Sequence, residues 1–266
     1  MVRVPGDDEE VSWRTWHAML SARYRPGCVV AVWVVGGLEH WCFRGAACPL
    51  SWQLPGVDIA IALFDQVTAL DAVGPYEVLQ RLPDAQLKFV GHRRGEIRTD
   101  NGFLGMTVDH TFDELPSPEI VLVPGGIGTR ALVHDQVILD WIRGAHETSK
   151  YTTSVCTGSL LLAAAGILDG LDAATHFSAR QLLTKYGAKP VEDRVVRQGK
   201  IITAAGVSSG IDMALELAEQ LTDATTAKAL QLMIEYDPQP PHDAGALHKV
   251  EPAVLARAQE LAALRN

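Results

Sequence analysis

The chain has 266 residues, of which 47% are hydrophobic and 21% charged, so it is long and apolar enough to bury a full core. Its formal net charge is -9, with 23 Lys and Arg against 32 Asp and Glu, which argues against an electrostatic nucleic-acid-binding protein. No apolar run reaches the roughly 18 residues of a membrane span, and the acidic start lacks the positive flank of a secretory signal. We therefore expect a globular cytoplasmic protein that binds neither nucleic acid nor membrane.

Residues 1–56 differ in composition from the rest of the chain, because they hold five of the 6 Trp and three of the 4 Cys. The apolar run 28–35 is typical of a strand but has no obvious partner strand nearby. We expect an appended N-terminal extension over 1–56, disordered or the product of a mis-assigned start, then a main domain over 57–243 and a C-terminal helix over 244–266. The extension contains Cys28, Cys42, Cys48 and His40, whose spacing does not favour a zinc site, so we expect no metal.

From residue 57 onward, short apolar runs alternate with helical patterns, which predicts βαβ units and a parallel sheet. The expected strands cover 59–64, 87–90, 120–123, 151–155 and 201–204. The expected helices cover 69–82, 137–146, 160–168, 210–221, 224–235 and 252–264. Within the second of these helices, Trp141 and Ile142 are expected to face the core. The pattern therefore predicts an α/β fold.

The strand over 151–155 leads directly into Cys156, Thr157 and Gly158 and then into a helix, which is the layout of a nucleophile elbow. Gly158 has no Cβ and permits a sharp turn. The N–H groups at the start of the helix, beginning with Thr157, would point at the sulfur and favour a thiolate. A free cysteine is more often a small buried hydrophobe, but this position favours a reactive one.

Asp71 follows the first expected strand, so its loop should open at the same carboxyl edge of the sheet as Cys156. Its apolar neighbours would desolvate the carboxyl group, raise its pKa and let it hold or pass a proton near the sulfur. Alternatively, Asp71 caps the helix that follows.

Gly125 and Gly126 close the strand over 120–123. With Ile127 they form the expected substrate and oxyanion loop, since a glycine N–H could donate to a developing anion, although an ordinary tight turn is the alternative. His176 is the best histidine for a Cys/His pair, yet its apolar neighbours make a core or loop histidine the safer interpretation. No phosphate-loop or dinucleotide-binding motif is present, so nucleotide binding has no support.

Four segments of the chain resemble the ThiJ/PfpI family of the class I glutamine amidotransferase-like superfamily. They are LDAVGPYE over 70–77, VPGG over 123–126, SVCTGS over 154–159 with AAGIL over 164–168, and YDPQPP over 236–241. The resemblance covers roughly residues 57–243. It implies a flavodoxin-like, doubly wound, mostly parallel sheet with helices on both faces. It also implies a homodimer that uses no metal or organic cofactor.

Within this family, Cys-Thr-Gly-Ser combined with Leu-Asp-x-x-Gly-Pro is similar to the branch that hydrates isocyanides to N-substituted formamides, a lyase reaction on a small molecule. The resemblance implies that Cys156 is the nucleophile, that Asp71 is the acid/base beside it, and that Thr157 positions the intermediate or donates to it. The chain departs from the protease-like and glyoxalase-like branches, which tend to carry His next to the cysteine or Glu in place of Asp71.

Two other functions fit the same motifs. One is the ligand-sensing domain of AraC-type regulators, although the stretch after Tyr236 is short for a helix-turn-helix domain. The other is a stress-response protein that uses Cys156 as a sensor thiol. We expect an enzyme rather than a sensor.

Overall fold

The computed structural model describes residues 57–264, and the backbone alone of β1 (Ala31–Val35) and β2 (Leu38–Cys42). The chain divides into two units, Met1–Trp52 and Gln53–Asn266. In the first unit β1 and β2 pair antiparallel, so the run expected to lack a partner has one. The sequence signal that we missed is Gly36-Gly37, a dipeptide that favours hairpin turns. The remaining expectations for residues 1–56, including the side chains of the possible metal group, lie outside the described residues.

The second unit is built on a seven-stranded sheet in the order β12-β13-β9-β8-β3-β4-β7. All neighbouring pairs are parallel except the edge pair of β12 with β13. Every residue of β8 is buried, as is typical of a strand covered on both faces. The strands are β3 (Asp58–Ala62), β4 (Gln86–Gly91), β7 (His110–Thr111), β8 (Ile120–Val123), β9 (Tyr151–Val155), β12 (Val195–Gln198) and β13 (Ile201–Ala204). The predicted mostly parallel sheet is confirmed.

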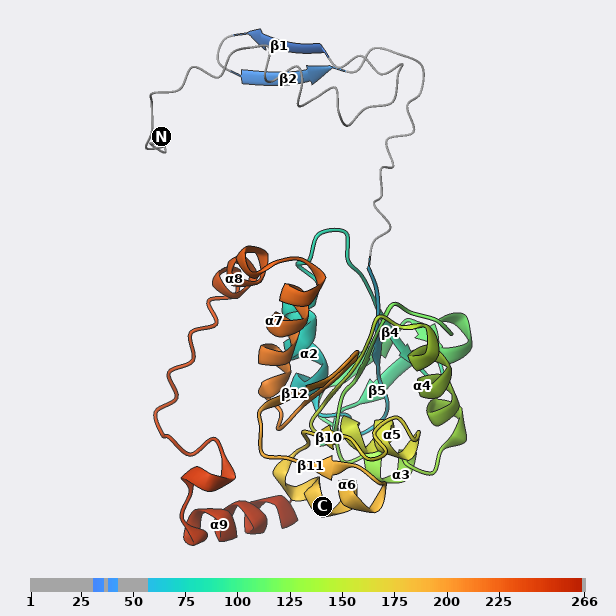
Figure 1. The fold of residues 1–266 in the computed structure, drawn as a ribbon, viewed down its shortest axis with the longest axis vertical. Coiled ribbons are helices and arrows are strands. Elements are labelled where there is room, and N and C mark those ends of the chain that lie inside the picture. Colours follow the sequence, from blue (N-terminus) through green and yellow to red (C-terminus); the bar gives the residue numbers. More distant parts are fainter. Residues whose placement is uncertain (1–30, 36–37, 43–56, 265–266) are drawn as a thin grey trace. The chain divides into compact units, whose positions relative to one another are not determined.

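Helices cover both faces of this sheet (Figure 1). One face carries α2 (Ala69–Leu79) and α7 (Ser209–Leu221), and the other carries α4 (Gln136–Thr148) and α5 (Gly158–Ala164). Trp141 and Ile142 of α4 are buried, as predicted. The other helices are α3 (Thr129–Leu132), α6 (Arg180–Lys185), α8 (Ala224–Met233) and α9 (Pro252–Ala263), with short turns η1 (Phe112–Glu114), η2 (Phe177–Ala179) and η3 (Leu247–Lys249). The doubly wound arrangement is therefore confirmed.

Four helices end earlier than predicted, α8 and α9 by one or two residues and α2 and α5 by three or four. The helix α2 ends at Leu79 rather than at residue 82, and the N–H groups of Arg81 and Leu82 donate three residues back, to Val78 and Leu79, as in a tightened last turn. The helix α5 ends at Ala164, and the chain reverses through Gly166, whose φ is +81°. From residue 57 onward the pattern also missed six short strands, namely β7 and β12 of the main sheet and β5 (Gly95–Arg98), β6 (Gly105–Val108), β10 (Asp172–Ala173) and β11 (Lys189–Pro190).

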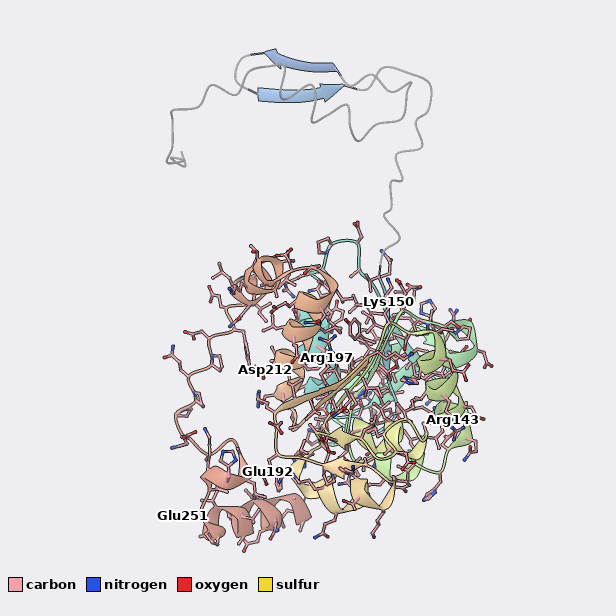
Figure 2. The ribbon with its side chains drawn as sticks, viewed as in Figure 1. Arg143, Lys150, Glu192, Arg197, Asp212 and Glu251 are labelled. Carbon is pink, nitrogen blue, oxygen red and sulfur yellow. The ribbon has the colours of Figure 1, made fainter. Side chains whose placement is uncertain are left out.

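The segment after α8 is tied back to the domain. The Tyr236 hydroxyl donates to the carboxylate of Asp212, which Figure 2 labels on α7, with a separation of 3.3 Å. Beyond this tie, α9 covers most of the expected C-terminal helix and buries none of its side chains. No helix in the described part of the chain combines the length and the apolar character needed to cross a membrane.

Candidate active site

The three loops predicted to carry chemistry follow β3, β8 and β9, which are adjacent parallel strands. Their carboxyl ends therefore lie at one edge of the sheet. Asp71 comes from the first turn of α2 after β3, Gly125 follows β8 and Cys156 follows β9. The predicted meeting of these residues is confirmed by their mutual contacts.

Cys156 lies at a sharp turn between β9 and α5. Its φ is +58°, in the left-handed region, which costs an L-residue about 1–2 kcal/mol. Its N–H donates to the Ala204 carbonyl at 3.0 Å. Its own carbonyl accepts from the hydroxyls of Ser159 and Thr175, both at 3.1 Å. The elbow geometry is that predicted from the sequence, and only 5% of Cys156 is exposed.

Burial of the sulfur opposes the thiolate that we expected at Cys156. Burial, and then the charge of Asp71, raise the pKa of the Cys156 thiol above its ordinary value. The Thr157 N–H lowers this pKa, as a helix start should, but its effect is smaller than that of burial. Burial therefore favours the protonated thiol, and attack by the sulfur needs a neighbouring group that accepts its proton.

Asp71 is fully buried, and burial raises the pKa of its carboxyl group to about 7. The Gly125 N–H donates to Oδ2 at 2.9 Å and opposes this rise, as does the neighbouring Cys156 thiol, whereas the charge of Asp100 adds to it. Oδ1 has no hydrogen-bond partner among the described residues. Thr68, not Asp71, occupies the N-cap position of α2, so the helix-cap alternative is wrong. Asp71 can therefore gain or lose a proton near neutral pH.

The N–H groups of the two glycines after β8 donate hydrogen bonds to other residues of the protein. Gly125 donates to Asp71, and Gly126 donates to the Thr157 hydroxyl at 2.9 Å, which donates back to the Gly126 carbonyl at 3.1 Å. A Cβ on Gly125 would lie 2.5 Å from the Thr157 nitrogen. The expectation that these N–H groups serve a developing anion is therefore wrong, because the loop joins Asp71 to Thr157. Ile127 is half-buried, and no described contact joins it to the sulfur.

His176 does not pair with Cys156. Its Nδ1 hydrogen-bonds with the Ser178 hydroxyl at 2.8 Å, and burial, followed by the charge of Arg130, lowers the pKa of His176. The neighbouring Thr175 is the residue of this segment that contacts Cys156. Sequence reasoning missed it because a threonine before a histidine carries no signal of a long-range hydrogen bond.

Within residues 57–264 no group of three or more His, Cys, Asp or Glu side chains could hold a metal ion. The site places one thiol beside one carboxyl group, and burial raises the pKa of both. Such a pair can deliver sulfur to an electrophile while the carboxyl group takes up the proton and returns it.

Comparisons with known proteins identify the family to which the chain belongs. The model of the DJ-1/PfpI family matches residues 57–220. An isonitrile hydratase of Pseudomonas putida is 43% identical over 207 residues, which cover 78% of this chain and 90% of that protein. The crystal structure of a ThiJ/PfpI family protein from Pseudomonas syringae has a TM-score of 0.74 at 35% identity and covers 84% of this chain and 93% of its own. The HTH-type transcriptional regulator GbdR of Pseudomonas aeruginosa is 28% identical over 50% of this chain and 37% of that protein. The chain belongs to the DJ-1/PfpI family.

Proposed function

We propose that this protein hydrates isocyanides to N-substituted formamides, with Cys156 as the nucleophile and Asp71 as the acid/base. The observation that carries the proposal is the buried pair itself, a thiol beside a carboxyl group whose pKa is raised to about 7. The 43% identity to an isonitrile hydratase over most of both chains supports the choice of substrate class.

In the first step the Cys156 sulfur bonds to the terminal carbon of R–N≡C. The thiol proton passes to the Asp71 carboxylate, and Asp71 then gives it to the same carbon. The product is a thioimidate, R–N=CH–S–Cys156, in which the sulfur and the hydrogen of the thiol are both bonded to the former isocyanide carbon. Asp71 suits this step because its carboxylate can accept the proton and its acid form can release it.

In the second step water adds to the thioimidate carbon. Asp71 accepts a proton from the water and passes it to the substrate nitrogen. The tetrahedral adduct R–NH–CH(OH)–S–Cys156 then loses the sulfur as its hydroxyl gives a proton to Asp71, and Asp71 passes this proton to the sulfur. The products are R–NH–CHO and the free thiol, so the net reaction consumes one water.

Two further features favour an isocyanide over an ester or amide. The N–H groups of Gly125 and Gly126 are engaged within the protein, so the predicted donors to a tetrahedral oxyanion are missing. The first step with an isocyanide forms no oxyanion. In addition, Cys156 exposes 5% of its surface, which suits a linear group whose electrophilic carbon is at its tip.

Ligand sensing is the second candidate, supported by the similarity to the regulator GbdR. A binding domain needs a pocket but no proton-accepting group beside a buried thiol. The Asp71–Cys156 pair therefore favours catalysis. A sensor thiol is less well supported, because Cys156 is 5% exposed and oxidants have little access to its sulfur.

Self-association and location belong to the same proposal. Leu70 is 42% exposed and lines a groove with Val73, Ile211 and Ile234, beside the ion pair of Glu77 with Arg81. We propose that a second copy of the chain covers this groove, since exposed apolar side chains that gather in one place mark interaction surfaces. Sedimentation of the purified protein tests this self-association.

We place the protein in the cytoplasm, where its free Cys156 would stay reduced.

The decisive experiment is a turnover assay with a simple alkyl isocyanide, in which formamide is followed by proton NMR. The wild-type protein should form formamide, whereas Cys156→Ala should remain folded and form none. A wild-type protein that binds the isocyanide without turnover would support the sensing candidate. Formamide produced at the wild-type rate by Cys156→Ala would contradict covalent catalysis.

A further inference from the structure

The peptide unit between Cys156 and Thr157 has a partner at each end. Its carbonyl oxygen accepts two hydrogen bonds, from the hydroxyls of Ser159 and Thr175, each at 3.1 Å. Its N–H, which belongs to Thr157, acts on the Cys156 sulfur and favours the thiolate. Because a peptide unit is planar and its C=O and N–H point in opposite directions, fixing the oxygen also aims the N–H at the sulfur.

The two hydroxyls differ in their sequence separation from Cys156. Ser159 is three residues beyond Cys156, in the first turn of α5, and is a local partner. Thr175 is 19 residues away and 1% exposed. Its position is set by the segment after β10, where the Ala174 N–H donates to the Thr203 hydroxyl of β13 at 2.8 Å. Thr175 therefore links the turn at Cys156 to β13.

We propose that Thr175 is a positioning residue that holds the peptide unit between Cys156 and Thr157 and through it aims the Cys156 thiol. The hydrogen bond to the carbonyl also polarises the peptide unit, which makes the Thr157 N–H a stronger donor to the sulfur. The charged group that acts directly on the thiol is Asp71. Thr175 thus adjusts the thiol without touching the substrate.

The test measures the reactivity of the thiol itself. Thr175→Val removes the hydroxyl but keeps the shape of the side chain, and we expect alkylation of Cys156 by iodoacetamide to slow about tenfold at pH 8, with its pH profile displaced upward. Thr175→Ser should restore the wild-type rate. Thr153→Val is the matched control, because Thr153 is equally buried and donates to the Val121 carbonyl at 3.0 Å rather than to Cys156.

Formamide formation provides the second readout, and only this part rests on the proposed function. In Thr175→Val we expect kcat to fall about tenfold with little change in KM. Alkylation needs no isocyanide, so it tests the inference even if the proposed reaction fails. If Thr175→Val alkylates as fast as Thr153→Val, the proposal is overturned. Should Thr175→Val not fold, Thr175→Ala removes the same hydroxyl, and an alkylation rate there equal to that of Thr153→Val overturns it equally.

Discussion

Asp71→Asn should make the protein more stable and inactive at the same time. Burial raises the pKa of the Asp71 carboxyl group from its ordinary value of 3.8 to about 7, so the folded state binds this proton more tightly than the unfolded state. The protonated Asp71 therefore contributes to the stability of the folded state. This contribution is complete below about pH 4 and is lost as the pH rises towards 7. Because each pKa unit corresponds to about 1.4 kcal/mol, the ionised carboxylate destabilises the folded state by about 4 kcal/mol at high pH.

Asparagine removes this charge and keeps the shape. Its side-chain oxygen can still accept from the Gly125 N–H, and its amide group takes the place of the unpaired Oδ1. Part of the 4 kcal/mol is offset by desolvation of the new amide, so we expect a gain of about 1–3 kcal/mol at pH 8.5. For a domain of this size, such a gain raises the melting temperature by about 3–10 °C.

Thermal unfolding at pH 8.5 and pH 5 measures the effect. The advantage of Asp71→Asn should shrink by more than half at pH 5, where the wild-type Asp71 is protonated in the folded state. Asp84→Asn, at an exposed aspartate, is the control and should change the melting temperature little at either pH. The reasoning is refuted if Asp71→Asn is no more stable than wild type at pH 8.5, or if its gain is the same at both pH values.

Three further outcomes follow from the site. First, kcat/KM should fall about tenfold per pH unit below 7, because the Asp71 carboxylate must accept the thiol proton; a flat profile from pH 5 to 8 would exclude that role. Second, Gly125→Ala should reduce kcat/KM by at least about 100-fold, since its Cβ would lie 2.5 Å from the Thr157 nitrogen, whereas Gly144→Ala, with no atom within 4 Å of its Cβ, should leave turnover unchanged. Third, His176→Ala should change kcat less than about threefold, because no described contact links His176 to the sulfur; a loss of two orders of magnitude in stopped-flow or steady-state assays would restore the Cys/His pair.

The sheet and the elbow could be predicted because their signals are local. The run over 120–123 is entirely apolar, so a strand buried on both faces follows directly. Cys156 stands between a strand pattern and a helix pattern, and the turn between them follows from sequence order alone. The adjacency of Asp71 and Cys156 then needs only the rule that parallel strands share a carboxyl edge.

The protonation and hydrogen bonding of the site could not be predicted in this way. The thiolate expectation considered the helix N–H groups but not the desolvation of a sulfur that is 5% exposed. We expected the N–H groups of Gly125 and Gly126 to donate to a ligand. In the structure they donate to Asp71 and Thr157 on the neighbouring loops. Asp100, which influences Asp71 and accepts from the Thr68 hydroxyl at 3.3 Å, comes from the turn between β5 and β6, two strands without a clear apolar pattern.

The loops of the site are joined to one another by hydrogen bonds. The Thr68 N–H donates to the Gly125 carbonyl at 2.9 Å, Gly125 donates to Asp71, and Gly126 exchanges two hydrogen bonds with Thr157. No one loop can open without breaking the others, so the site belongs to the cooperative folding unit of the sheet rather than to a separately melting region. Amide protons of Thr68 and Gly126 should exchange with solvent as slowly as those at the centre of β8. Loss of catalysis on heating should then coincide with loss of the fold itself.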